Sequence, residues 1–280
     1  MKSLKTTILK EIQLAVEDTR SSDCDKLEDA VHSFRRRCKR IRAYLRLLPS
    51  SLSKQARRAR RHTRLAAASL SKLRDAQVMD RILLQIHERL VKSSGQGPSV
   101  EKSSSVSQEK TKPSPCAASP VQDQLISAAK LLNKAKRVVS HLSNNQDKSS
   151  LFVNLQKTYS AARLATQLAA NRACPEDFHE LRKITKQFYH QCQFVASALD
   201  RELQTEIDHA RIIADKLGNA QDLSVLTSNL INDLKKGDEP TVPAVIEESQ
   251  RQMTTLFDES ILLACRLYFE SPKEFGRRIT

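Results

Sequence analysis

Apolar residues recur every three or four positions along almost the whole chain, and this periodicity constrains the fold more than any other feature. The spacing places apolar side chains on one face of an α-helix, and that face must pack against other helices. Strands and tight turns are disfavoured, because aromatic residues make up 4% of the chain and only 5 of 280 residues are glycine. The sequence therefore predicts an all-α protein.

The periodic segments predict eight helices, and prolines and glycines mark several of their ends. Pro49 ends the second helix, Pro175 opens the sixth at a position where proline is tolerated, and Gly237 closes the seventh. Residues 93–120 interrupt the pattern, and we expect a disordered insertion there, because Ser, Pro, Lys and Gly dominate and valine is the only large apolar residue. The expected helices cover about residues 5–20, 24–48, 51–92, 121–143, 149–171, 175 onward, 201–236 and 243–270.

A pair of short motifs occurs twice in the same order. Residues 31–36, Val-His-Ser-Phe-Arg-Arg, align with 178–183, Phe-His-Glu-Leu-Arg-Lys, at an offset of 147. Residues 72–77, Lys-Leu-Arg-Asp-Ala-Gln, align with 216–221, Lys-Leu-Gly-Asn-Ala-Gln, at an offset of 144. Two similar offsets in the same order predict that a unit of four helices has been duplicated.

The duplication divides the chain into two expected four-helix bundles. The first covers residues 1–145 and includes the insertion, and the second covers residues 146–271. Residues 272–280 are expected to form a tail outside both bundles.

The formal net charge of +15 is concentrated in one segment. Between Val31 and Arg74 the sequence has 15 Lys and Arg residues and no Asp or Glu. Subtracting these 15 from the total of 47 leaves 32 basic residues, which balance the 32 acidic residues of the chain. Because clustered cations repel one another in a compact fold, the segment is expected to bind an anionic partner. A face of solvated charges is the simpler alternative, although such faces usually mix both signs.

The helix that contains Val31 carries its apolar and cationic residues on adjoining faces. Its apolar residues follow the 3-4-3-4-3 spacing of a packing seam: Val31, Phe34, Cys38, Ile41, Leu45 and Leu48. The repeated helix has a similar seam, in which Thr185 is the polar exception. Each helix is therefore expected to pack into its bundle on one side and to present cations beside the seam.

The two cationic stripes can face a shared groove if the bundles are related by rough twofold symmetry. Arg forms bidentate hydrogen bonds to phosphate oxygens and Lys supplies a mobile charge, so such a groove suits a polyanion. Release of condensed counterions would supply much of the affinity. The stripes consist of His32, Arg35, Arg36, Lys39, Arg42 and Arg46 in the first copy and of His179, Arg182, Lys183, Lys186 and His190 in the second.

Further candidate anion ligands lie on other expected helices. Lys72 and Lys216 occupy matching positions of the repeat. A face of the fourth helix could close the cavity, and a solvated face is an equally good explanation of its cations. The third-helix candidates share a face and are Arg57, Arg60, Arg61 and Arg64, and the fourth-helix candidates are Lys130, Lys134 and Arg137.

These motifs resemble those of the CHAD family, the conserved histidine α-helical domain. The family's helix begins His-x-x-Arg, continues with basic residues, and occurs once in each half, as residues 32–42 and 179–189 do here. Its later Leu-Arg-Asp-Ala turn resembles residues 73–77 and 217–222. The resemblance covers nearly the whole chain apart from the insertion and the tail.

The resemblance implies two four-helix bundles packed around a basic cavity or pore that accommodates inorganic polyphosphate. It assigns the binding surface to the two cationic helices and involves no catalytic residue and no cofactor. The second copy departs from the family at Gln187 and Tyr189, where a basic residue is common. The second half is therefore expected to bind anions more weakly than the first.

Three other functions remain as alternatives to non-enzymatic polyphosphate binding. The charge also suits the phosphate backbone of RNA or DNA, although Tyr44 and Tyr189 are the only aromatic residues near the stripes and single-strand binding usually uses stacking platforms. A polyphosphate hydrolase is less favoured, because hydrolysis typically needs metal-binding carboxylates or a positioned base. No metal is expected, since cations surround both His32 and His179. A scaffold that binds an acidic protein is the third alternative.

The cellular compartment follows from weaker signals. Six cysteines without a Cys-x-x-Cys pair suit a reducing compartment. No apolar run has membrane-spanning length and no secretory signal is visible, so no membrane association is expected. The basic stretch 57–64 resembles a nuclear import signal, so the nucleus with its nucleolus is expected ahead of the cytoplasm.

Overall fold

The structure, a computed structural model, is helical throughout the part of the chain that it describes, without strands there. Some features expected from the sequence lie outside the residues that the structure describes: nearly all of the insertion 93–120, Lys72, and most of residues 71–92. The described residues are 3–19, 27–70, 83, 86, 120–143, 148–234 and 242–280.

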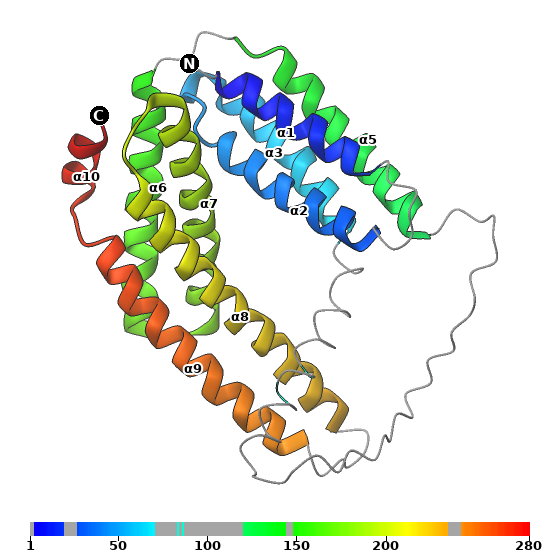
Figure 1. Cartoon of the computed structure of the whole chain (residues 1–280), viewed down its shortest axis with the longest axis vertical. Coiled ribbons are helices and arrows are strands. Elements are labelled where there is room, and N and C mark those ends of the chain that lie inside the picture. The colour runs from blue at the N-terminus through cyan, green and yellow to red at the C-terminus, as the bar shows by residue number, and fades with distance from the viewer. Residues whose placement is uncertain are drawn as a thin grey trace.

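One group of helices comes from the first half of the chain. Helix α1 packs against α2 and α5, and α3 packs against α2 and α5. A short 3-10 turn, η2, spans Ser50–Leu52 directly after Pro49 and leads into α3. Figure 1 shows these helices side by side at one end of the molecule. Their bounds are α1 Leu4–Asp18, α2 Leu27–Tyr44, α3 Ser53–Ala68 and α5 Pro120–Ser140.

A second group comes from the second half of the chain. Helices α6, α7, α8 and α9 each pack against the next one in the chain. Helices α8 and α9 run side by side (Figure 1). Helix α10 packs on α6. The bounds are α6 Lys148–Arg172, α7 Pro175–Leu199, α8 Gln204–Leu234, α9 Val242–Leu267 and α10 Pro272–Ile279.

The helix ends follow local sequence signals in most places. Pro175 occupies the first turn of α7, and Asp200 ends this helix in a left-handed conformation with φ of 51°. The third expected helix is shorter than predicted, because α3 ends at Ala68, where the Ser69 hydroxyl donates to the carbonyl of Ala66 at 3.0 Å. A hydroxyl bonded to the preceding turn competes with continuation of the helix.

The predicted seams are confirmed as the interior of the molecule. All six seam residues from Val31 to Leu48 are buried, with Leu45 and Leu48 in the turn that follows α2. The α7 seam residues are buried as well: Phe178, Leu181, Phe188, Cys192 and Val195. Thr185, the polar member of the α7 seam, is also buried, and its hydroxyl accepts a hydrogen bond from Tyr268 at 3.2 Å. The buried polar group is thereby satisfied, as burial requires.

Helices α2 and α7 join the two groups. The rings of Tyr44 and Phe194 lie 5.5 Å apart, and the Gln191 side chain donates to the carbonyl of Ala43 at 3.1 Å. One continuous apolar core runs through both groups as a result. The two repeated helices of the sequence are therefore neighbours in space.

A smaller apolar cluster lies away from this junction. Ile86, from the first half of the sequence, is buried there against Leu223 and Leu226 of α8 and Val245 of α9. A residue of the first expected bundle thus packs on helices of the second. The division of the chain into two duplicated four-helix bundles stays a prediction.

Residues 272–280 are not the expected tail, because they form helix α10. Ser271 and Glu274 form a reciprocal capping box at its start, and Pro272 lies in its first turn. Phe275 is fully buried and stacks on Tyr159 of α6 with ring centroids 4.0 Å apart. The proline and the glycine of this segment are compatible with a short helix once it docks on α6.

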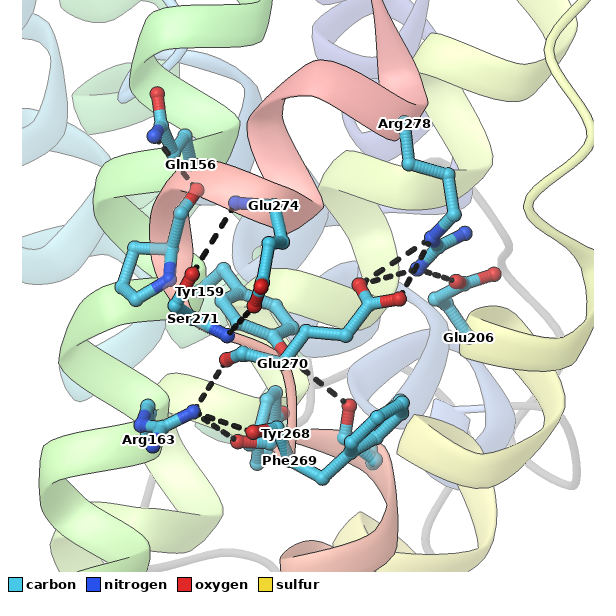
Figure 2. A network of polar contacts seen from close by, with 12 residues as sticks. Gln156, Tyr159, Arg163, Glu206, Tyr268, Phe269, Glu270, Ser271, Glu274 and Arg278 are labelled. Carbon is cyan, nitrogen blue, oxygen red and sulfur yellow. Dashed lines mark hydrogen bonds and ion pairs between the residues drawn. The ribbon is translucent and has the colours of Figure 1, made fainter.

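Polar contacts fix this C-terminal segment in place (Figure 2). Arg163 donates from Nη1 to the backbone carbonyls of Tyr268, Phe269 and Glu270 at the end of α9. Arg278 forms ion pairs with Glu270 at 3.1 Å and with the buried Glu206 of α8 at 2.6 Å. The last helix is therefore anchored to both α6 and α8.

Candidate functional site

An open cleft of about 600 Å³ lies between α2 on one side and α7 and α8 on the other. Its lining contains ten Lys or Arg side chains but only three carboxylates. Two histidines, His32 and His190, also line the cleft. The cations are Arg35, Arg36, Lys39, Arg40, Arg42, Arg46, Arg182, Lys183, Lys186 and Arg211, and the carboxylates are Glu180, Asp215 and Asp222.

The basic residues of α2 divide between the cleft and the opposite flank. On that flank, Arg37 binds Asp18 of α1 at 2.7 Å and Glu11 at 3.3 Å. Arg40, at the border, binds Glu11 at 3.3 Å and also lines the cleft. Carboxylates from α1 therefore neutralise part of the segment that contains no acidic residue of its own.

The cleft side of α2 carries the predicted stripe. All six predicted residues from His32 to Arg46 line the cleft. Arg36, Arg42 and Arg46 form no ion pair with any residue that the structure describes. Burial lowers the pKa of the Arg42 guanidinium, and the nearby Arg46 lowers it further. The lowered pKa of Arg42 reflects its burial first and its closeness to other cations second.

The α7 side of the cleft is cationic but partly neutralised. Lys183 pairs with Glu180 on its own helix, and Lys186 pairs with Asp215 of α8 at 3.2 Å. Lys186 also lies over the ring of Tyr189 at 5.4 Å from its centroid. These exposed pairs are weak individually, but they reduce the positive potential on this side.

Arg182 of α7 reaches the cleft across a glycine. A Cβ atom placed on Gly218 of α8 would lie 3.2 Å from Nη2 of Arg182. Glycine at this position of the second motif therefore lets the guanidinium lie directly against the α8 backbone. The second copies of the two sequence motifs, one on α7 and the other on α8, meet at this contact.

The histidines of the second copy lie in two different environments. His179 is exposed, does not line the cleft, and lies with Nδ1 3.1 Å from Oε1 of Gln221. His190 lines the cleft but is only 3% exposed, and burial lowers its pKa to about 3. Its Nε2 atom has no hydrogen-bond partner. His190 is thus a neutral, buried group at the cleft rather than a cation.

The predicted residues of α3 lie outside the cleft lining but next to it. The electrostatic influence on Arg60 comes from Arg46, Arg57 and Arg42, after burial as the main cause of its lowered pKa. Arg64 acts on Arg42 in the same way. Arg61 is exposed and acts on His62 of its own helix.

The remaining predicted residues are not brought into the cleft. Lys130, Lys134 and Arg137 of α5 are exposed, and Lys134 acts on His62. Lys216 of α8 instead pairs with Glu259 of α9. None of the four appears in the cleft lining.

Two cations of the cleft were not predicted. Arg40 lies one turn after Arg36 and was not included in the predicted stripe. Arg211 lies seven residues before Gly218 on α8, at the helical spacing that places both on one face. Extending the second motif backward by two turns would have found it.

The described residues hold no cluster of three or more His, Cys, Asp or Glu side chains that could bind a metal ion. None of the described helices is long and apolar enough to cross a membrane.

Comparisons with known proteins agree with this arrangement at the level of the family. Neither the curated proteins nor the solved structures yielded a match. The family model for the CHAD domain matches residues 6–230, which is most of the chain and includes both cleft-lining halves. The chain belongs to the CHAD family.

Proposed function

We propose that this protein binds long-chain inorganic polyphosphate in the cleft between α2 and α7–α8 without changing it chemically. The observation that carries the proposal is the excess of ten Lys or Arg side chains over three carboxylates in the cleft lining. Membership of the CHAD family is consistent with a polyphosphate ligand. A linear phosphate polymer offers many equivalent oxygens to cations spread over two helices.

The spacing of the α2 cations supports an extended ligand. His32 and Arg42 are ten positions apart on α2, which corresponds to about 15 Å along the helix axis, and Arg46 extends the row into the turn that follows. A compact phosphate compound would contact only part of such a row. The two four-helix bundles and the basic cavity between them belong to this proposal, with α2 and α7 as the duplicated helices.

The two sides of the cleft are unequal in this proposal. The α2 side supplies Arg36, Arg42 and Arg46, which form no ion pair with the described residues. On the α7 side, Lys183 and Lys186 each already hold a carboxylate. A ligand must compete with those carboxylates, so α2 contributes more of the affinity.

Binding without hydrolysis is supported by the state of the carboxylates. Phosphoryl hydrolysis needs carboxylates that bind a metal ion or act as a base. Two of the three carboxylates in the cleft lining are engaged by cations, Glu180 by Lys183 and Asp215 by Lys186. Incubation of the protein with polyphosphate and Mg²⁺ or Mn²⁺ should release no orthophosphate above the level of a buffer control.

A nucleic acid is the second candidate ligand, and Tyr189 is the observation that favours it. The tyrosine lines the cleft, and Lys186 lies over its ring. An aromatic face beside cations can stack a base. One such platform stands against a much larger set of cations, so the phosphate polymer remains the favoured ligand.

Calorimetric titration with long-chain polyphosphate tests the proposal. The triple variant Arg36→Ala, Arg42→Ala, Arg46→Ala should bind much more weakly, and the slope of log K against log salt should fall by about 2, because three phosphate contacts are lost. The matched control is Lys10→Ala, Lys157→Ala, Lys273→Ala, which removes three exposed cations far from the cleft lining.

Three results of this titration would count against the proposal. Equal loss of affinity in the two triple variants would show that only total charge matters. Displacement of bound polyphosphate by RNA at equal phosphate concentration and physiological salt would favour the nucleic-acid alternative. Absence of any binding by the unmodified protein would leave an acidic protein partner as the better explanation.

The proposed compartment is the nucleus with its nucleolus, ahead of the cytoplasm. Arg57, Arg58, Arg61 and Arg64 of α3 are exposed and thus accessible to an import receptor. Microscopy of a fluorescent fusion, compared with a fusion in which Arg58 and Arg61 are alanine, tests this assignment. Exclusion of the unmodified fusion from the nucleus would contradict it.

A further inference from the structure

Five arginines lie along the packed pair of helices α2 and α3, and the cleft accounts for only some of them. Two of them, Arg42 and Arg46, line the cleft, whereas the other three lie beyond its lining on α3. Together they are called the α2–α3 arginine cluster, which consists of Arg42, Arg46, Arg57, Arg60 and Arg64.

The antiparallel packing of α2 and α3 determines which arginines meet. At one end of the pair, Nη1 of Arg35 donates to the carbonyl of Ala67 at 3.1 Å. Further along, Arg42 lies within electrostatic range of Arg64, and Arg46 within range of Arg60. The α2 numbers rise as the α3 numbers fall, so the two rows of arginines run beside each other.

The face of α3 that carries these arginines is separate from its other flank. Ala56, Ala59, Thr63 and Ala66 are the buried residues of α3. Arg57, Arg60 and Arg64 follow at the 3-4 spacing of one adjoining face, toward α2. His62 lies on the opposite flank, where Lys134 of α5 acts on it.

The cluster holds unbalanced charge in a partly buried position. Nε of Arg60 is buried and has no hydrogen-bond partner. None of the five arginines forms an ion pair with a residue in the described part of the chain. Guanidinium groups crowded together without a carboxylate repel one another, and a buried donor without an acceptor costs free energy. Both costs are removed when an anion with several oxygens binds to the α2–α3 arginine cluster.

We infer that the α2–α3 arginine cluster is a second anion-binding subsite, continuous with the cleft through Arg42 and Arg46, that holds the stretch of a long polyphosphate chain leaving the cleft. The inference rests on the proposed function of the cleft. It adds a chain-length preference: a chain that fills only the cleft gains nothing from α3, whereas a longer chain reaches Arg57, Arg60 and Arg64. These residues span about 10 Å of helix axis, enough to contact several successive phosphates.

The variant Arg57→Ala, Arg60→Ala, Arg64→Ala isolates the α3 part of the subsite. Its affinity for long-chain polyphosphate should fall roughly tenfold or more, because three phosphate contacts are lost. Its affinity for tripolyphosphate should stay within error of the unmodified protein. The matched control removes three exposed cations of the same helical group that lie outside the α2–α3 arginine cluster. Its substitutions are Lys10→Ala, Arg58→Ala and Lys136→Ala. Far-UV circular dichroism confirms that both variants keep their helicity.

The outcomes separate this inference from the proposed function. Loss of long-chain affinity in the α3 variant but not in the control, with tripolyphosphate binding retained, supports the subsite. Equal long-chain affinity in variant and control would reject it while leaving the cleft proposal intact. An equal loss for tripolyphosphate would also reject it, because the arginines would then belong to the cleft itself. If the unmodified protein binds neither ligand, the proposed function and this inference fail together.

Discussion

Replacing His190 with glutamine should make the fold less sensitive to acid. His190 is buried beside the cleft, and burial lowers its pKa to about 3. Lys186 of α7 and Arg40 and Lys39 of α2 lower it further, whereas the contact with Gln193 opposes the shift. In the unfolded chain this histidine has the ordinary pKa of about 6.5. The unfolded chain therefore binds the proton at a much higher pH than the folded protein does.

The direction and size of the effect follow from this difference. A depressed histidine pKa leaves stability intact above about pH 6.5 and removes it as the pH falls from there toward about 3. Between about pH 7 and pH 5, protonation of the unfolded state alone lowers the free energy of unfolding by about 2 kcal/mol. Glutamine does not titrate, so the His190→Gln variant lacks this contribution.

Urea denaturation followed by far-UV circular dichroism measures the effect. Unfolding free energies of the unmodified protein and of His190→Gln are compared at about pH 7 and pH 5. The unmodified protein should lose about 2 kcal/mol more than the variant over this interval. The matched control for the substitution itself is His179→Gln, at an exposed position of the same helix.

Parallel pH dependence of the unmodified protein and the His190→Gln variant would refute the reasoning. It would mean that His190 takes up its proton in the folded state near the ordinary pKa, and hence that the cleft floor is more hydrated than its burial implies. A larger acid loss in the variant than in the unmodified protein would contradict the sign.

Two further perturbations test contacts that position the cleft and the last helix. Gly218→Ala should raise the free energy of unfolding by about 0.5–1 kcal/mol, because alanine favours the helix more than glycine does. It should also lower the affinity for polyphosphate, because the new methyl group displaces Arg182. Thermal denaturation measures the first effect and titration the second, and an unchanged affinity would contradict the second. Arg278→Ala should cost about 1–3 kcal/mol by leaving the buried Glu206 without its partner. The exposed Arg277→Ala should change stability little, and equal effects of the two would refute the role of the ion pair.

The interior of the molecule could be predicted from sequence because one rule governs it. The α2 seam from Val31 to Leu48 and its counterpart on α7 follow from helical spacing, and every predicted seam residue is buried. Periodicity reports the face that a helix buries, whatever it packs against. The same rule placed the α2 cations beside the seam, where they line the cleft.

Helix α10 was missed because its stability depends on docking more than on its length. Eight residues with a proline and a glycine are too few to form a helix alone. The stacking of Phe275 on Tyr159 supplies the missing stabilisation. A local signal was present, however, since Ser271 and Glu274 have the spacing of a capping box.

The pairing of charges could not be predicted, because it depends on which helices become neighbours. Lys186 meets Asp215 only because α7 packs on α8. The burial of His190 likewise depends on the junction between the two helical groups, so a sequence stripe classed it with the exposed cations. Sequence spacing identifies the face of a residue but not the residue opposite.

The contacts of α1 with α2 make the two sides of α2 different for an approaching anion. Glu11 and Asp18 act as built-in competitors that occupy Arg37 and Arg40 before any outside anion arrives. A polymer that approaches from the α1 side meets cations already taken, together with two repelling carboxylates, whereas one that approaches from the cleft does not. Selectivity of this kind arises as much from blocking the wrong surface as from strengthening the right one. In the proposed function, α2 therefore offers a polyanion mainly the edge that lines the cleft.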